Sequence, residues 1–203
     1  MIRGLYTAAS SMDVLEKKTN IRSNNLANVN TNGFKKSESI TRSFPEMLLS
    51  RIEADKKSQE VGELSTGSYI ENSFKDMSQG SFQQTGNKLD FAIEGEGFFV
   101  IETEAGQRYT RDGNFTLNSE SELVTQSGNY VLDSQGERIQ LIPGQDFRIT
   151  TKGEITFNNG LQGSQINIVD FAEESQLIQE GDNLYAVQAG AEQVESQAAV
   201  AQG

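Results

Sequence analysis

The sequence predicts a mainly β protein with one N-terminal α-helix, built from an antiparallel all-β central domain and an extended arm. Two observations lead to this prediction. Apolar residues recur every three or four positions from residue 1 to about residue 32, which is the period of a helix. Beyond Leu89 the period changes to two, and short apolar runs alternate with turn signals. The expected boundaries are a helix with its ending motif at 1–36, a connecting segment at 37–88, the β domain at 89–188 and a linker at 189–203.

The helix has a narrow apolar seam that does not stabilise it in isolation. The members of the seam are Leu5, Ala8, Met12, Leu15, Leu26 and Val29. Two polar residues, Thr19 and Arg22, interrupt it at the same three- and four-residue spacing. Isolated helices owe most of their stability to the packing of an apolar face. The seam therefore predicts a packing partner.

The helix ends in an asparagine-rich stretch, SNNLANVNTNGFKK, at residues 23–36. Asparagine is a mediocre helix former, because its side chain competes with the backbone for hydrogen bonds. Asn32 and Gly33 predict a left-handed stop, and the lysines that follow suit the negative end of a helix. Capping does not explain the amides upstream, which line one polar strip at three- and four-residue spacing. They belong to Asn24, Asn25 and Asn28.

The connecting segment is mixed in character. Pro45 precedes an apolar run, so we expect a short helix between Phe44 and Ile52. The polar residues that follow this run predict a loop or an extended arm.

Turn signals divide the β domain into hairpins. Asp112-Gly113 and Asn159-Gly160 supply the positive φ that tight hairpin turns require. The longest uninterrupted apolar run, Phe98 to Ile101, predicts a buried strand. The end of the chain is small and polar, with Val200 as the single large apolar residue after Val194, and it predicts a linker.

Composition excludes several classes of function. The net charge is -12, and the acidic excess lies beyond residue 40, so no clustered basic face indicates a nucleic-acid partner. With no cysteine and no histidine, the chain lacks disulfides, thiol nucleophiles, imidazole bases and the usual zinc ligands. No apolar run is long enough for membrane insertion, and the N-terminus lacks the apolar region of a cleavable signal peptide.

Several short motifs have ordinary structural explanations. Gly95-Glu96-Gly97 begins a GxG motif, but a strand follows it rather than a helix, so it predicts a turn and not a dinucleotide site. Carboxylates two residues apart, as at Glu94 and Glu96, share one face of a strand and suit a solvated surface better than a glycosidase pair. Asp112-Gly113-Asn114 lacks the spacing of a calcium loop. We predict no catalytic, cofactor-binding or metal-binding residue, and no cofactor.

The asparagine-rich stretch closely resembles the N-terminal signature of the bacterial flagellar rod and hook proteins. The residues that carry this signature are Asn24, Asn25, Asn28, Thr31, Gly33, Phe34 and Lys35. Two longer stretches match the same family in the same order, LDFAIEGEGFFV at 89–100 and YTRDGNF at 109–115. Shorter matches, LVT at 123–125 and GDNLY at 181–185, extend the resemblance to about Val187. The chain is therefore identified as a member of the flagellar basal-body rod group.

The resemblance implies a structural subunit of the basal-body rod, not an enzyme, that polymerises helically into the torque-transmitting drive shaft. It implies self-association, contacts with other rod and hook proteins, and export through the flagellum-specific type III apparatus to the basal body in the cell envelope. The seam residues would pack between helices, and the amide strip would form lateral hydrogen bonds. The short connecting segment and single β domain are similar to rod proteins rather than to the longer hook protein, with the distal-rod type favoured over the proximal-rod type.

One feature of the family is absent from the sequence. Its members continue into a second, C-terminal helix that pairs with the first helix, whereas this chain stops at Gly203. The resemblance therefore implies that residues 189–203 lead toward that helix.

The residues alone leave two other functions open. One is a monomeric β-rich binding module whose N-terminal helix is an interaction arm. The other is an enzyme, for which the sequence offers no convincing catalytic constellation. Assembly with neighbouring subunits separates the structural role from the binding module.

Overall fold

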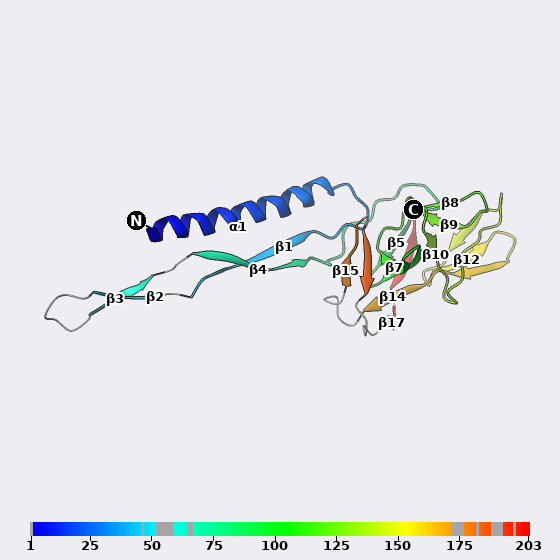
Figure 1. Cartoon of the computed structure of the whole chain (residues 1–203). Helices are drawn as coiled ribbons and strands as arrows, with labels where there is room; N and C mark the ends of the chain where they lie inside the picture. Colours follow the sequence, from blue (N-terminus) through cyan, green and yellow to red (C-terminus); the bar gives the residue numbers. More distant parts are fainter. Residues whose placement is uncertain are drawn as a thin grey trace. The chain divides into compact units, whose positions relative to one another are not determined.

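A computed structural model of the protein describes residues 2–45, 47–51, 59–64, 67–171, 177–181, 183–187, 193–196 and 198–203. The chain forms two compact units, whose elements are drawn in Figure 1. The first unit contains Met1–Asn30 and Lys35–Ser78, and the second contains Thr31–Phe34 and Gln79–Gly203. The predicted fold class is confirmed, because the described residues form an N-terminal helix and antiparallel β-sheets.

The helix of the first unit, α1, spans Ile2–Ala27 and ends before the predicted position near residue 32. The asparagines cause this early end. The backbone N–H of Asn28 donates to the Asn24 carbonyl at 3.2 Å, and the Asn28 side-chain Nδ2 donates to the same oxygen at 2.9 Å. The next hydrogen bond, from Val29 N to Leu26 O at 3.3 Å, is already of the tighter 3-10 type. The competition of asparagine side chains with the backbone therefore stops α1.

The other described residues of the first unit include two antiparallel ladders, which we call the ribbon. In these ladders β1 (Ser37–Ser43) pairs with β4 (Ser68–Lys75), and β2 (Met47–Arg51) pairs with β3 (Gln59–Leu64). The helix predicted between Phe44 and Ile52 is wrong over the described residues 47–51, which form β2. A residue before proline favours extended geometry, so Phe44 before Pro45 continues as extended chain. Pairing with β3 then supplies the hydrogen bonds that a helix forms within itself.

The second unit is built from antiparallel sheets. Its strands are β5 (Phe91–Glu94), β6 (Phe98–Thr103), β7 (Gly106–Thr110), β8 (Phe115–Leu117), β9 (Leu123–Thr125), β10 (Tyr130–Val131), β11 (Phe147–Ile149), β12 (Glu154–Phe157), β13 (Gln162–Gln165), β14 (Ile168–Phe171), β15 (Leu177–Gln179), β16 (Leu184–Val187), β17 (Gln193–Glu195) and β18 (Ala199–Gln202). The central sheet has nine strands in the order β15-β16-β7-β6-β10-β9-β8, with β14 between β6 and β17. A three-stranded sheet contains β11, β12 and β13, and β18 pairs with β5.

The end of the chain, predicted to be a linker, is part of the second unit. β17 pairs with β14, and β18 pairs with β5. Val200 of β18 is buried in the core, and the Gln202 side chain accepts a hydrogen bond from Ile149 N and donates one to Lys88 O. The described residues 193–196 and 198–203 are therefore not a linker. Their small side chains give no sequence pattern that predicts a strand. The backbone hydrogen bonds that hold them are formed with β14 and β5, and β5 is far away in the sequence.

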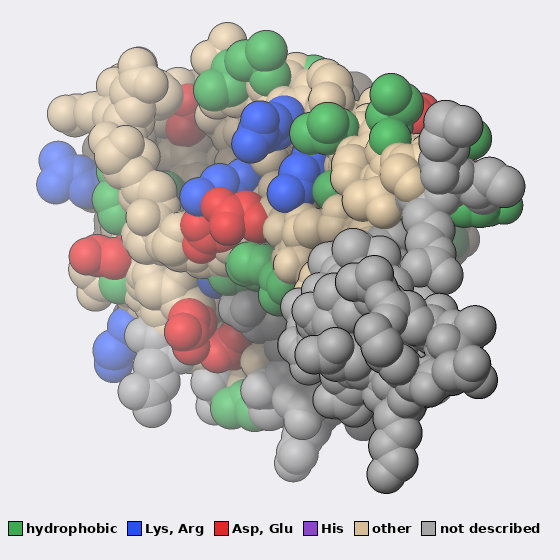
Figure 2. All heavy atoms as spheres, turned by 90° about the vertical axis from the view of Figure 1, so that its left-hand side faces the viewer, with side chains coloured by type: hydrophobic (Ala, Val, Ile, Leu, Met, Phe, Trp, Pro, Cys, Tyr) green, Lys and Arg blue, Asp and Glu red, His purple; other side chains and the backbone are tan. Residues whose placement is uncertain are grey.

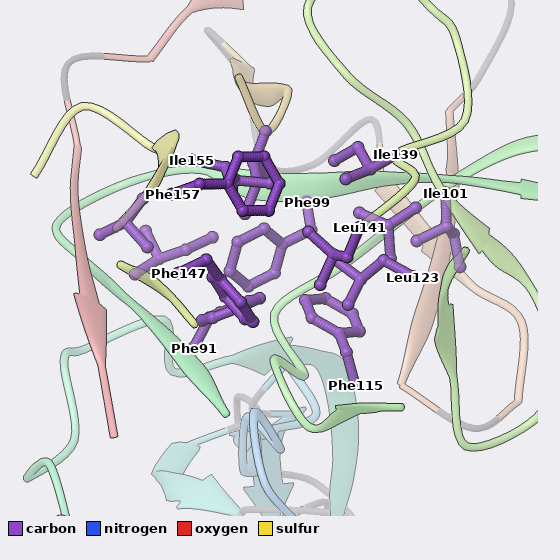
Figure 3. Packing of buried hydrophobic residues seen from close by; sticks show 14 residues of the cluster. Phe91, Phe99, Ile101, Phe115, Leu123, Ile139, Leu141, Phe147, Ile155 and Phe157 are labelled. Carbon is purple, nitrogen blue, oxygen red and sulfur yellow. The ribbon is translucent and has the colours of Figure 1, made fainter. Parts of the chain in front are cut away.

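The core of the second unit collects side chains from most of its strands, and Figure 3 shows them pointing toward one another. Its members are Phe91, Ile93, Phe99, Ile101, Phe115, Leu123, Val131, Ile139, Leu141, Phe147, Ile155, Phe157, Ile166 and Val200. Strand β6 is buried on both faces, which confirms the predicted buried strand. Its Phe98 lies outside this cluster and packs against the rings of Phe171 and Tyr185, with centroids 5.9 and 5.3 Å away.

The substitution Gly113→Ala is expected to destabilise the second unit. A Cβ at this position would collide with the Phe91 carbonyl oxygen, while Phe91 N donates to Gly113 O at 2.9 Å. The added methyl group therefore displaces β5. We expect the free energy of unfolding, measured by chemical denaturation, to fall by about 1–3 kcal/mol.

The control for this variant is Gly80→Ala, because nothing lies within 4 Å of a Cβ at position 80. Its unfolding free energy should stay within about 0.5 kcal/mol of the parent protein. Equal stability of the two variants would contradict the close approach at Gly113.

Candidate functional site

The apolar seam of α1 lies on the surface of the first unit. Its large side chains are between 63% and 72% exposed, and Ala8 is exposed as well. They belong to Leu5, Met12, Leu15 and Leu26 of α1 and to Val29 in the turn that follows the helix. On the face drawn in Figure 2, hydrophobic side chains lie at the surface among charged ones. Scattered exposed leucines are ordinary, but a row at helical spacing along one helix is typical of an interaction surface.

A different face of α1 is covered by the ribbon of its own unit. The helix packs on β1 and β4. Val14 is 5% exposed, and Ser10, Ile21 and Asn25 are half-buried at helical spacing from it. At Gly67, just before β4, a Cβ would collide with the Ser10 hydroxyl, so the glycine permits close approach. The ribbon therefore covers this face and leaves the seam exposed.

The signature residue Asn25 connects α1 to the ribbon. Its side-chain Nδ2 donates to the Ser37 carbonyl at 2.9 Å, and its Oδ1 accepts from the Ser37 N–H at 3.0 Å. The amide therefore satisfies both backbone groups of the first residue of β1. Asn28 uses its amide on the Asn24 carbonyl, and the Asn24 side chain is exposed. Two amides of the predicted polar strip thus form hydrogen bonds within the chain.

The signature residue Gly33 lies against the backbone of the second unit. It has φ of 69°, in the left-handed region that the sequence predicts for it. A Cβ at this position would lie 2.6 Å from the Arg111 carbonyl carbon and from the Asp112 nitrogen. Glycine is therefore required here for its conformation and for its lack of a side chain. The family signature that contains Gly33 is therefore in contact with the family match that contains Arg111.

Asn183 holds the residue next to this glycine. Its side-chain Nδ2 donates to the Asn32 carbonyl at 3.0 Å. Asn183 is 6% exposed and has φ of 58°, and its own carbonyl accepts a hydrogen bond from the buried Thr110 hydroxyl at 3.1 Å. Sequence reasoning includes Asn183 in a family match but assigns it no role. The sequence signal that could have indicated a turn here is Asn183 itself, two residues after Gly181, since asparagine tolerates left-handed backbone in turns.

The signature residue Lys35 belongs to the first unit and forms hydrogen bonds within it. It is 8% exposed, and its Nζ donates to the carbonyls of Met77 and Ser78 at 3.2 and 2.9 Å. The Asp76 N–H also donates to the Lys36 carbonyl at 2.9 Å. Lys35 therefore holds the two sides of the ribbon together at its base. The remaining signature residues are Thr31, which is exposed, and Phe34, which is half-buried.

The carboxylate of Asp76 adds an ionic contact at the base of the ribbon. Hydrogen bonds from the Ser78 hydroxyl and backbone N–H, together with the Lys36 ammonium, lower the pKa of Asp76 from 3.8 to about 2. The Lys36 Nζ lies 3.0 Å from Oδ2 of Asp76 and 2.9 Å from Oε1 of Glu38. These carboxylates raise the pKa of Lys36, so the contact stays charged at neutral pH.

Other kinds of site are not found in the part of the chain that the structure covers. No group of three or more acidic, histidine or cysteine side chains there could hold a metal ion. No helix there combines the length and the apolar character needed to cross a membrane.

Comparison with known proteins yields two family matches. Residues 92–182 match the model described as flagellar hook protein FlgE/F/G D1 domain, and residues 5–35 match the model described as flagella basal body rod protein. The chain is 36% identical to the flagellar basal-body rod protein FlgG of Bacillus subtilis, over 91% of this chain and 73% of that protein. It is 32% identical to the flagellar hook-basal body complex protein FlhO of the same species, over 92% and 74%. It is 33% identical to the flagellar basal-body rod protein FlgF of Caulobacter vibrioides, over 91% and 73%.

Replacing Asn25 by alanine is expected to loosen α1 from the ribbon. The change leaves the N–H and the carbonyl of Ser37 without their side-chain partner. We expect the free energy of unfolding of the first unit to fall by about 1–3 kcal/mol, measured by hydrogen exchange of the amides in the ladder between β1 and β4 other than Ser37. Asn24→Ala is the matched control, because its side chain is exposed and the carbonyl that Asn28 uses is retained. Equal effects of the two substitutions would refute this account of Asn25.

The base of the ribbon is expected to weaken in acid. A carboxyl whose folded-state pKa is depressed contributes stability above its unfolded pKa, and this contribution is lost as pH falls. For Asp76 the loss occurs between about pH 4 and about pH 2. At pH 5, the Ser78 amide should be better protected from hydrogen exchange in the parent protein than in the Asp76→Asn variant. This difference in protection should vanish near pH 2. A difference that does not change with pH would exclude the Asp76 carboxylate as its cause.

Proposed function

Because the chain belongs to the flagellar basal-body rod and hook protein family, which is structural and not enzymatic, we propose that it polymerises helically into the torque-transmitting rod. Its partners in this proposal are further copies of itself and other rod and hook proteins. We also propose that it reaches the basal body through the type III export apparatus without cleavage of a signal peptide.

The observation that supports assembly most directly is the exposed seam of α1. The ribbon of the same unit already covers another face of the helix. The seam therefore has to be buried by something else, since a row of exposed leucines costs free energy in water. A neighbouring helix is the occupant that suits it, because the seam has the three- and four-residue spacing of helix–helix packing.

The polymer that we propose is open rather than closed. A contact between two different surfaces of the same protein generates a helical filament when its rotation does not close a ring. In this arrangement the seam residues pack between helices. Of the amide strip, Asn24 has the exposed side chain that suits lateral hydrogen bonds, whereas Asn25 and Asn28 bond within the chain.

Within the rod we propose the distal-rod type, with the proximal-rod type as the alternative. Relatives named FlgG and FlgF are similar to the chain to nearly the same degree, at 36% and 33% identity. The short connecting segment and single β unit favour either rod type over the hook protein. Restoring motility to a strain that lacks one of the two rod proteins, but not the other, decides between them.

The monomeric binding module remains the other candidate for the exposed seam. It uses the same surface, since an interaction arm also needs an apolar face. Family membership favours assembly over this alternative.

The substitutions Leu15→Asp and Leu26→Asp are expected to abolish assembly. Each places a carboxylate in a seam that assembly buries, and a buried unpaired charge is costly. We expect incorporation of the chain into purified hook–basal bodies, measured by quantitative mass spectrometry, to fall by about a hundredfold or more. The thermal transition of the β unit should stay unchanged, because both residues lie in the first unit.

The matched control is Asn20→Asp, which adds the same charge at an exposed position of α1 outside the seam. Its incorporation should remain within about twofold of the parent chain. Normal incorporation of both leucine variants would refute the rod proposal, and joint unfolding of both units would refute the separation of seam and core.

A further inference from the structure

The chain contains two asparagine–glycine pairs, Asn32-Gly33 and Asn159-Gly160. Such a pair is chemically labile, because the backbone nitrogen of the glycine can attack the asparagine side-chain amide with no Cβ in its path. The attack requires the peptide plane between the two residues to rotate until the nitrogen reaches the Cγ atom. Its rate therefore depends on how freely that plane moves, and the two pairs differ in this freedom.

The peptide plane of Asn32-Gly33 is held on both sides. The Asn32 carbonyl accepts a hydrogen bond from the Asn183 side chain at 3.0 Å. Gly33 lies so close to neighbouring backbone that an added Cβ would be 2.6 Å from the Arg111 carbonyl carbon and from the Asp112 nitrogen. All of these residues belong to the second unit. Rotation of this plane therefore requires the turn to detach from packed backbone.

The peptide plane of Asn159-Gly160 is held less firmly. Both residues are exposed, in the hairpin between β12 and β13. The Gly160 N–H donates to the Phe157 carbonyl at 2.9 Å, but no described residue donates to the Asn159 carbonyl. Nothing lies within 4 Å of a Cβ at position 160. Opening this turn breaks one solvent-exposed hydrogen bond, which costs less than detaching packed backbone.

The side-chain amide of Asn159 forms two further hydrogen bonds at the surface. Its Nδ2 donates to the Gln145 Oε1 at 3.0 Å, and its Oδ1 accepts from the Leu161 N–H at 3.1 Å. Water competes for both bonds, because the residues are exposed. They slow the attack relative to an unfolded chain without preventing it.

We propose that Asn159 is the site at which the folded chain deamidates, and that the packing around Gly33 protects Asn32 from the same reaction. Hydroxide removes the proton of the Gly160 N–H, and this nitrogen then bonds to the Asn159 Cγ. The bond from Cγ to Nδ2 breaks and releases ammonia, which leaves a cyclic imide. Water adds to one of the imide carbonyls and opens the ring to aspartate or isoaspartate. The reaction consumes one water, releases one ammonia and is independent of assembly.

The product changes the contacts of an exposed loop. An aspartate at position 159 has no side-chain N–H, so the hydrogen bond to Gln145 is lost. The hairpin keeps the hydrogen bond from the Asn158 N–H to the Asp146 carbonyl at 3.1 Å. Deamidation at Asn159 therefore loosens this loop, whereas the same reaction at Asn32 would rearrange a turn of the family signature.

The test follows deamidation of the purified full chain in mildly alkaline buffer, by peptide mapping with mass spectrometry. In the folded chain, Asn159 should react at least about tenfold faster than Asn32. In guanidinium chloride the two rates should agree within about twofold, because glycine follows both residues and neither is packed. Equal rates in the folded chain, or faster reaction at Asn32, would overturn the proposal. So would a folded chain in which Asn159 stays intact while the denatured chain reacts completely.

Asn183→Gly tests the protection of Asn32 directly. It removes the amide that holds the Asn32 carbonyl, and glycine tolerates the φ of 58° at this position. Deamidation of Asn32 should rise by about threefold or more, as expected for the loss of one hydrogen bond. The rate at Asn159 is the internal control and should stay within about twofold of the parent chain. A parallel rise at both sites would mean that global unfolding sets the rates, and it would overturn the protection by packing.

Asn159→Asp tests the effect of the product on the loop. Hydrogen exchange of the Asn158 amide should become faster by about twofold or more, because the neighbouring link to Gln145 is lost. The amides in the ladder between β6 and β7 should exchange as in the parent chain. Unchanged exchange at Asn158 would refute the loosening of the loop.

Discussion

The close approach of Gly33 to the backbone of Arg111 and Asp112 is the constraint on which the course of the chain depends. A side chain at this position would overlap the neighbouring backbone, and the φ of 69° lies in the left-handed region that most residues with a Cβ rarely adopt. Thr31–Phe34 therefore belongs to the second unit, although the residues on both sides belong to the first. Asn183 strengthens this attachment through the Asn32 carbonyl. In chain order, α1 is followed by these residues of the second unit and then by the ribbon.

Contacts inside the chain explain most of the asparagine-rich signature. The Asn25 side chain forms hydrogen bonds with the backbone N–H and carbonyl of Ser37, as a neighbouring strand would. Lys35 donates to two carbonyls at the base of the ribbon. Both residues are polar, yet each stabilises the packing of the first unit because its hydrogen bonds are satisfied away from bulk water. The signature thus organises the exit of the chain from α1. The seam, on another face of the same helix, is left for a partner.

Sequence reasoning succeeded where the signal is local and failed where pairing is distant. The helix period located α1, and the apolar run at Phe98 located a strand that is buried on both faces. The helix predicted between Phe44 and Ile52 was wrong over the described residues 47–51, because Leu48 and Leu49 pair with β3. The end of the chain looked like a linker, because nothing in its small side chains shows that β18 pairs with β5.

The candidate site shows the same division. Periodicity along the chain, turn residues and the family signature are properties of neighbouring residues, so the seam, the left-handed Gly33 and the family could be read without a structure. Which face of α1 the ribbon covers, where the Asn25 amide bonds and what Lys35 holds depend on residues brought together only by folding. Asn183 lies far from Asn32 in the sequence and donates to it only because the second unit folds around both. A hydrogen bond of that kind has no local pattern, since its geometry is set by the packing of the whole unit.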